Sequence, residues 1–248
     1  MRKLLVTLLI GMICVCNSCL CFGADYFPEM TELPEETREH LTGMEKVIRS
    51  AIYQEYSAGD YQVYDHSVTN QDLFEKEFWD AALVYAVIWN PWVERDGYEN
   101  NPHLLKQSGV TERVILSEQE LMDFGHALFS DFEQIPEVPY DENLAAESQY
   151  VVKDNDNYLF SIVEWLDTET WTESVEVLED NALRLVVRDG MQGSENIPEH
   201  INSTFFVDLV PNTNVNPESD FPYYYSIKQV VFVKGAAEAI PEDALPAT

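Results

Sequence analysis

An uncharged stretch from Ala81 to Trp89 closes a segment whose first half, from Asp72, is rich in charge. A helix that is apolar on every side is buried on every side. The alanines in this stretch favour helix over the alternative, a short buried strand over residues 83–89. Asn90 precedes a proline and is therefore disfavoured in the α region. The pattern predicts a buried central helix over residues 72–89.

Two further helices are predicted on either side of it. Over residues 35–57, apolar residues recur at three- and four-residue steps, as on one buried face of an amphipathic helix. Over residues 117–132, the helix opens with Ser117-Glu-Gln-Glu120, which is a capping box. Pro136 and Pro139 prevent any continuation of that helix. In the helix over 35–57, the apolar residues expected to face the protein core are Leu41, Met44, Val47, Ile48, Ala51, Ile52 and Tyr56.

Beyond Ser148 the apolar period falls from about four to two, which predicts strands. Strands are expected at 151–152, 158–166, 172–178, 183–188, 203–210 and 223–233, with another short one at 110–116 and a short extended connector at 61–64. Residues 154–157, Asp-Asn-Asp-Asn, resemble the start of a calcium loop. Tyr158 and Leu159 then stand where that loop needs a ligand and a glycine, so a turn is predicted instead.

The register of one hairpin can be predicted from the sequence. A three-residue loop over 179–181, with Asn181 in the left-handed region, would pair Val177 with Leu183 and Val175 with Leu185. The same register sets Glu176 opposite Arg184, which is a favourable opposite-charge pair. A two-residue loop would set Val177 opposite Arg184, so the three-residue loop is preferred.

Together these elements predict an α+β fold with three helices packed on one face of an antiparallel sheet of five or six strands. The expected domain is residues 25–234, with a helical half at 35–132 and a sheet half at 148–234. Cystatin-like and nuclear-transport-factor-like arrangements are analogies of fold only and imply no function. Residues 235–248 are expected to form a disordered acidic tail.

Residues 1–24 have the features of a signal peptide: a basic start, an apolar run from Leu4 to Val15 and small residues near Ala24. The run is too short to span a bilayer comfortably, and no transmembrane segment is expected. All four cysteines lie within this segment. The mature chain would therefore contain no thiol. The prediction is a secreted protein, and the alternative is a cell-surface lipoprotein anchored through Cys19.

The charge is strongly negative, at −31 for the whole chain. Loss of Arg2 and Lys3 with the signal peptide would leave 12 basic residues against 45 acidic ones, a charge of −33. Such a field repels nucleic acid and attracts cations and basic partners. It also keeps a protein soluble, and solubility alone is the simpler interpretation.

The sequence has no familiar catalytic signature: no Gly-x-Ser-x-Gly, no His-Glu-x-x-His and no phosphate-binding loop. Its histidines are scattered singly, so no metal site or cofactor is expected. His126 follows Asp123 by three residues, which predicts an ordinary helix contact. Glu164 and Asp167 lie near tryptophans, as carboxylates do in sugar-handling clefts. They are the candidate acid and base of a carbohydrate hydrolase.

Trp92 and Tyr98 are the predicted ligand-binding residues. Trp92 follows a proline and directly precedes a long polar stretch, and Tyr98 lies within that stretch. Exposed aromatic residues in such positions often serve in recognition. The favoured function is a secreted, non-catalytic binding or interaction module for an unknown protein or glycan. The alternatives are a secreted carbohydrate hydrolase that uses Glu164 and Asp167, and a cation-binding acidic surface protein.

Overall fold

The computed structural model describes residues 33–52, 61–65, 71–88, 104–105, 113–145, 148–161, 169–191, 199–219 and 222–235. Its α-helices are α2 (Glu35–Thr42), α3 (Glu45–Ile52), α4 (Gln71–Ile88) and α5 (Glu118–Leu128). Its strands are β1 (Tyr61–Asp65), β2 (Leu104–Leu105), β3 (Arg113–Ser117), β4 (Val151–Asp154), β5 (Asn157–Ser161), β6 (Glu169–Val177), β7 (Leu183–Met191), β8 (His200–Pro211) and β9 (Tyr225–Lys234).

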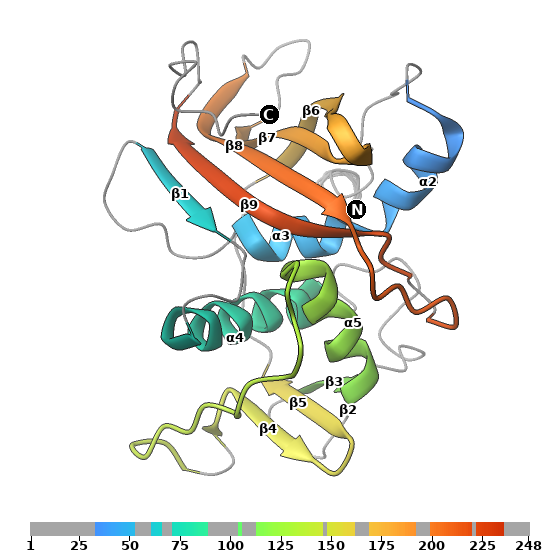
Figure 1. The fold of residues 1–248 in the computed structure, drawn as a ribbon. Coiled ribbons are helices and arrows are strands. Elements are labelled where there is room, and N and C mark those ends of the chain that lie inside the picture. Colours follow the sequence, from blue (N-terminus) through green and yellow to red (C-terminus); the bar gives the residue numbers. More distant parts are fainter. Residues whose placement is uncertain are drawn as a thin grey trace, which may run out of the picture.

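The strands form two antiparallel sheets, with the helices α3, α4 and α5 between them (Figure 1). The large sheet has the strand order β1-β9-β8-β7-β6, and the small sheet has the order β2-β3-β5-β4. Helices α3 and α5 pack on β9 of the large sheet, whereas α4 and α5 pack on β3 of the small sheet. One apolar core therefore joins both sheets through the helical layer.

The α+β class is confirmed, but the prediction of three helices on one face of a single sheet is wrong. The described residues form four α-helices and two sheets, of five and four strands. The stretch predicted as a connector at 61–64 is β1, an edge strand of the large sheet that pairs with β9. Strands β3 and β4 each pair with β5 instead of extending the large sheet. Nothing local in the sequence specifies which distant strand is the partner.

The predicted first helix is divided into α2 and α3 by a turn at Gly43 and Met44. Glycine is a poor helix former. The hydroxyl of Thr42 also donates to the carbonyl of Arg38 (3.0 Å), an interaction that tends to bend helices. The amide of Met44 donates to the carbonyl of Leu41 (2.8 Å), which tightens the turn. The predicted core positions from Leu41 to Ile52 are all buried.

The central helix is confirmed as α4. Phe78, Ala81, Ala82 and Ala86 are fully buried, as the apolar pattern predicts. Trp79 is also buried, and its indole Nε1–H donates to the carbonyl of Glu137 at 2.9 Å. Helix α4 therefore fixes a segment that lies 58 residues further along the chain.

The predicted hairpin is confirmed in its register. Strands β6 and β7 pair Val177 with Leu183, Val175 with Leu185 and Glu176 with Arg184. The connecting turn spans Glu179–Asn181, and both Asp180 (φ 56°) and Asn181 (φ 60°) are left-handed. The turn predicted within residues 154–157 also forms, with Asp154 opposite Asn157 and with Asn155 left-handed (φ 55°).

The predicted signal peptide (1–24) lies outside the described residues, as does nearly all of the predicted acidic tail. Both stay predictions. Within the part of the chain that the structure describes, no helix is long and apolar enough to cross a membrane.

Candidate interaction surface

The ligand-binding residues predicted from the sequence, Trp92 and Tyr98, lie outside the described residues, and so do Glu164 and Asp167. Their roles therefore stay predictions. The described residues form three other polar arrangements. Two of them join secondary structure elements, and the third holds a long surface loop in place.

The first arrangement connects helix α5 with the segment between β8 and β9. Asp123 is buried, and its two carboxylate oxygens accept hydrogen bonds from Gln119 Nε2 (2.9 Å) and Asn216 Nδ2 (3.0 Å). The expected partner, His126, is half-buried, and its ring lies edge-on to Phe132. Burial lowers the pKa of His126, and the nearby charge of Asp123 opposes this shift. Asp123 thus holds Asn216 against α5.

A buried tyrosine pair lies in the same region. The hydroxyl groups of Tyr85 and Tyr223 are 2.5 Å apart, so one donates to the other. Burial raises the pKa of Tyr223 well above its usual value, and the contact with Tyr85 and the charges of Asp123 and Glu120 add to the shift. The Tyr223 phenol is therefore protonated near neutral pH, and the pair connects α4 with the segment that precedes β9.

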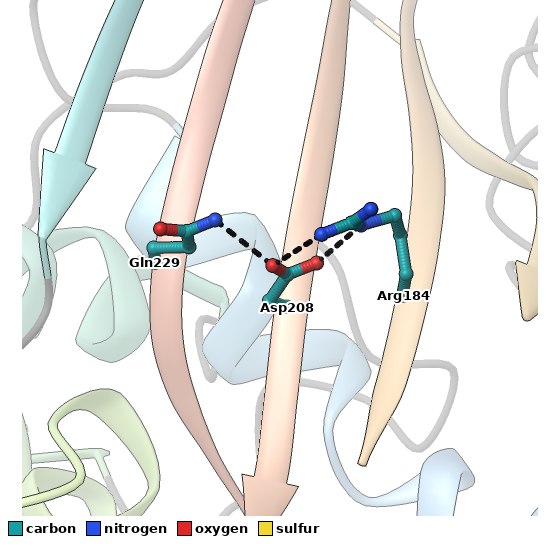
Figure 2. A network of polar contacts seen from close by, with 3 residues as sticks. All are labelled: Arg184, Asp208 and Gln229. Carbon is teal, nitrogen blue, oxygen red and sulfur yellow. Dashed lines mark hydrogen bonds and ion pairs between the residues drawn. The ribbon is translucent and has the colours of Figure 1, made fainter. Parts of the chain in front are cut away.

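The second arrangement crosses the large sheet (Figure 2). Arg184 on β7 donates to Asp208 on β8 through Nε (2.7 Å to Oδ1) and Nη2 (2.8 Å to Oδ2). Gln229 on β9 donates to the same carboxylate at 2.9 Å. The hydrogen bond with Asp208 raises the pKa of Arg184 more than burial lowers it, and the charge of Glu176 adds to the increase. Because Arg184 and Asp208 are both buried and bound to each other, they connect β7 with β8 and offer no free charge.

The third arrangement involves both ends of helix α5 and the loop that follows it. The predicted capping box forms, with Glu120 N–H donating to Ser117 Oγ and Ser117 N–H donating to Glu120 Oε2. The helix ends at Leu128 instead of near Phe132, because Phe129 adopts an extended conformation (φ −132°, ψ 130°). Phe132 then folds back over Gly125, where an added Cβ would lie 2.3 Å from the ring, and stacks on Phe78.

Between α5 and β4 the chain runs through a long loop, here called the anchored loop and defined as residues 129–150. Its described part from 129 to 145 contains no helix or strand. Loops of this length without secondary structure are uncommon in compact domains and are often functional. Pro136 is buried, Ile135 and Val138 pack against the core, and Glu137 accepts the hydrogen bond from Trp79. The described part from 129 to 145 is therefore irregular but held by contacts with the core.

Gln149 fixes the far end of the anchored loop. Its side chain is buried (4% exposed) and makes three hydrogen bonds with loop backbone. Oε1 accepts from the amide of Asp141 (2.9 Å), and Nε2 donates to the carbonyls of Asp141 (2.8 Å) and Leu144 (3.1 Å). The amide of Asn143 also donates to the Asp141 carboxylate (2.9 Å). These bonds give residues 141–144 one defined conformation.

The backbone of Gln149 is itself held by the small sheet. Its carbonyl accepts from Arg113 Nη2 (3.2 Å) and from Ser161 Oγ (3.1 Å). Arg113 is buried, donates through Nη1 to the carbonyl of Leu159 (3.2 Å), and has its pKa lowered by burial. The anchored loop is thus connected to β3 and β5 through buried hydrogen bonds.

Two exposed tyrosines flank this connection. Tyr140, 72% exposed, directly precedes Asp141, and Tyr150, 56% exposed, directly follows Gln149. The exposed carboxylates of the same loop are Asp131, Glu133, Glu137, Asp141 and Glu142. Residues 114–152 contain nine acidic residues and neither lysine nor arginine. The surface of the anchored loop therefore contains both exposed tyrosines and exposed carboxylates.

This surface was not predicted, although the sequence contains a signal for it. Pro136 and Pro139 mark an irregular segment, and the lack of any lysine or arginine from 114 to 152 shows the local charge imbalance. Among the described residues, no group of three or more His, Cys, Asp or Glu side chains could hold a metal ion. We found no protein-family model, curated protein or solved structure that matches the chain.

Proposed function

We propose that the protein is a secreted, non-catalytic binding module whose partner carries positive charge. The observation that carries this proposal is the local charge at 114–152, where nine acidic residues occur without any lysine or arginine. Five of these acidic residues are exposed on the anchored loop. A local excess of one charge attracts partners of the opposite charge and increases their association rate.

The buried charges support the same interpretation, because each already has hydrogen-bond partners inside the protein. Arg184 and Asp208 form a buried pair, Asp123 accepts two hydrogen bonds, and Arg113 donates to backbone carbonyls. Carboxylates on the surface, such as those of Asp141 and Glu142, are instead exposed to solvent. They can meet a partner without the cost of breaking a buried pair.

The test is binding of a short arginine–glycine peptide to the purified protein by calorimetry. A glutamate–glycine peptide of equal length is the control. We expect the basic peptide to bind at low salt and the acidic peptide not to bind. The affinity should fall by at least about tenfold at about 0.5 M salt, where the screening length is only a few ångströms. Equal affinity for the two peptides, or no binding of either, would refute the proposal.

A cation-binding surface protein is the other function that the same charge supports. Calcium chloride distinguishes it from the binding module. If the partner is a basic protein, calcium should compete with the arginine–glycine peptide only weakly and through general screening. Saturable calcium binding with a defined stoichiometry would favour the cation-binding function instead.

A further inference from the structure

We propose that Tyr140 and Tyr150 are the aromatic anchors of this surface, and that they contact arginine side chains in an extended basic segment of the partner. This inference rests on the proposed function and specifies its contact residues and its partner chemistry.

The exposure of the two tyrosines is large. Single apolar residues on a surface are common and need no explanation. These two, however, lie at both ends of the same hydrogen-bonded unit, since Gln149 precedes Tyr150 in the chain and bonds to Asp141, which follows Tyr140. Their common attachment to Gln149 indicates one surface rather than two unrelated side chains.

The fixation lowers the cost of binding. The backbone beside Tyr140 is held by the side chain of Gln149, which bonds to Asp141. Beside Tyr150, Arg113 and Ser161 hold the carbonyl of Gln149, and the carbonyl of Tyr150 accepts from the amide of Ser161 (2.8 Å). Tyrosine has few rotatable bonds and offers a large contact area. A partner therefore gains this area without first having to order a flexible loop, and less conformational entropy is lost on binding.

The charge around the tyrosines specifies the partner. Asp141 and Glu142 follow Tyr140 directly, and Glu137 lies three residues before it; all three are exposed. A guanidinium group interacts with the face of an aromatic ring and can bind a carboxylate through two hydrogen bonds. Arginine makes both interactions better than lysine. An acidic segment would be repelled by these carboxylates, and a neutral one would gain no charge attraction.

The experiment compares peptides and variants in one cycle. The protein is titrated with an arginine–glycine peptide and with a lysine–glycine peptide of equal charge. We expect the arginine peptide to bind more tightly to the wild type. In the double variant Tyr140→Ala/Tyr150→Ala, its affinity should fall by about tenfold or more, and the preference for arginine should be lost. The double variant Tyr140→Phe/Tyr150→Phe keeps the aromatic faces and should retain the preference.

Matched controls separate this surface from other exposed residues. Val177 is 53% exposed on the β6–β7 hairpin, and Val177→Ala should leave the affinity within about twofold of the wild type. For charge, Glu137→Gln/Asp141→Asn/Glu142→Gln removes as many charges as Glu35→Gln/Glu36→Gln/Glu39→Gln. The second set lies on α2, beside the large sheet and away from the small sheet (Figure 1). The loop set should weaken binding several-fold more than the α2 set.

The outcomes distinguish the two proposals. If the wild type binds the basic peptides but the tyrosine-to-alanine variant binds equally well with the same arginine preference, this inference is wrong and the proposed function stands. The inference is also wrong if the α2 set weakens binding as much as the loop set. If the wild type binds no basic peptide, both proposals fail. A melting curve for each variant verifies that it is folded.

Discussion

Removing the side chain of Gln149 tests whether its hydrogen bonds hold the anchored loop in one conformation. Gln149→Ala deletes its three hydrogen bonds with the backbone of Asp141 and Leu144 and leaves the bonds from Arg113 and Ser161 to the carbonyl of residue 149 in place. We therefore expect residues 141–144 to lose their fixed conformation while the small sheet stays paired.

The expected loss of stability follows from those bonds. A hydrogen bond of this kind contributes about 1 kcal/mol net, so three bonds contribute about 3 kcal/mol if nothing relaxes. Asp141 is exposed and Leu144 is half-exposed, so water can replace part of the loss. The free energy of unfolding should fall by about 1–2 kcal/mol, which in a chain of this size lowers the melting temperature by a few degrees per kcal/mol.

Two measurements test this prediction: a denaturant melt and amide hydrogen exchange. In Gln149→Ala the amide of Asp141 should exchange much faster than in the wild type, because its acceptor is gone. Gln149→Glu is the informative comparison, since it keeps the size but sets a carboxylate against two carbonyl oxygens, and it should be destabilised more at neutral pH than in acid. Wild-type exchange at Asp141 together with an unchanged melt in Gln149→Ala would refute the role assigned to Gln149.

Three other changes test the packing and the buried charges. Gly125→Ala should lower the free energy of unfolding by about 1–2 kcal/mol, because the new methyl group overlaps the ring of Phe132. This overpacking costs more than the gain from alanine as the better helix former. A melt that shows stabilisation would contradict this prediction. Asp208→Ala should cost about 3 kcal/mol by leaving Arg184 buried without its ion-pair partner, and adding Arg184→Met should recover part of that loss in the same assay. Burial lowers the pKa of His126 in the folded state, so neutral His126 contributes to the free energy of unfolding above the unfolded pKa of about 6.5, and this contribution is lost as the pH falls below that value. His126→Gln should therefore lose less stability than the wild type between about pH 7 and pH 5. An unchanged pH profile of stability would contradict this prediction.

Local patterns predicted the local structure well. The capping box at Ser117 predicted the start of α5, and the absence of charge between Ala81 and Trp89 predicted that α4 is buried. The register of the β6–β7 hairpin follows from the loop length together with the opposite charges of Glu176 and Arg184. In each case the residues that form the predictive pattern lie close to one another in the sequence.

The arrangement of the sheets could not be predicted in this way. Strand β1 pairs with β9, which lies at the opposite end of the described chain, and the alternation of residues within a strand does not specify a distant partner. Arg184 shows the same limit. Its predicted neighbour Glu176 is opposite it, but its guanidinium binds Asp208, which lies 24 residues away.

The anchored loop depends on contacts of both kinds. Pro136 and Pro139 indicate a loop, but the bonds that fix it come from Trp79 and Arg113, at 58 and 36 residues' separation. The sequence therefore indicates an irregular acidic segment, whereas its rigidity is visible only in the structure. Trp92 and Tyr98 stay predicted binding residues, to be tested by the same peptides as Tyr140 and Tyr150.

Hydrogen exchange with and without the arginine–glycine peptide tests the central claim most directly, because it locates the contact without any mutation. We predict that the peptide slows exchange in the anchored loop, above all at residues 140–145 and 148–150, while α2 and the β6–β7 hairpin are unchanged. Slowed exchange at β6 or α2, with no change in the anchored loop, would show that the basic segment binds elsewhere and would contradict the account.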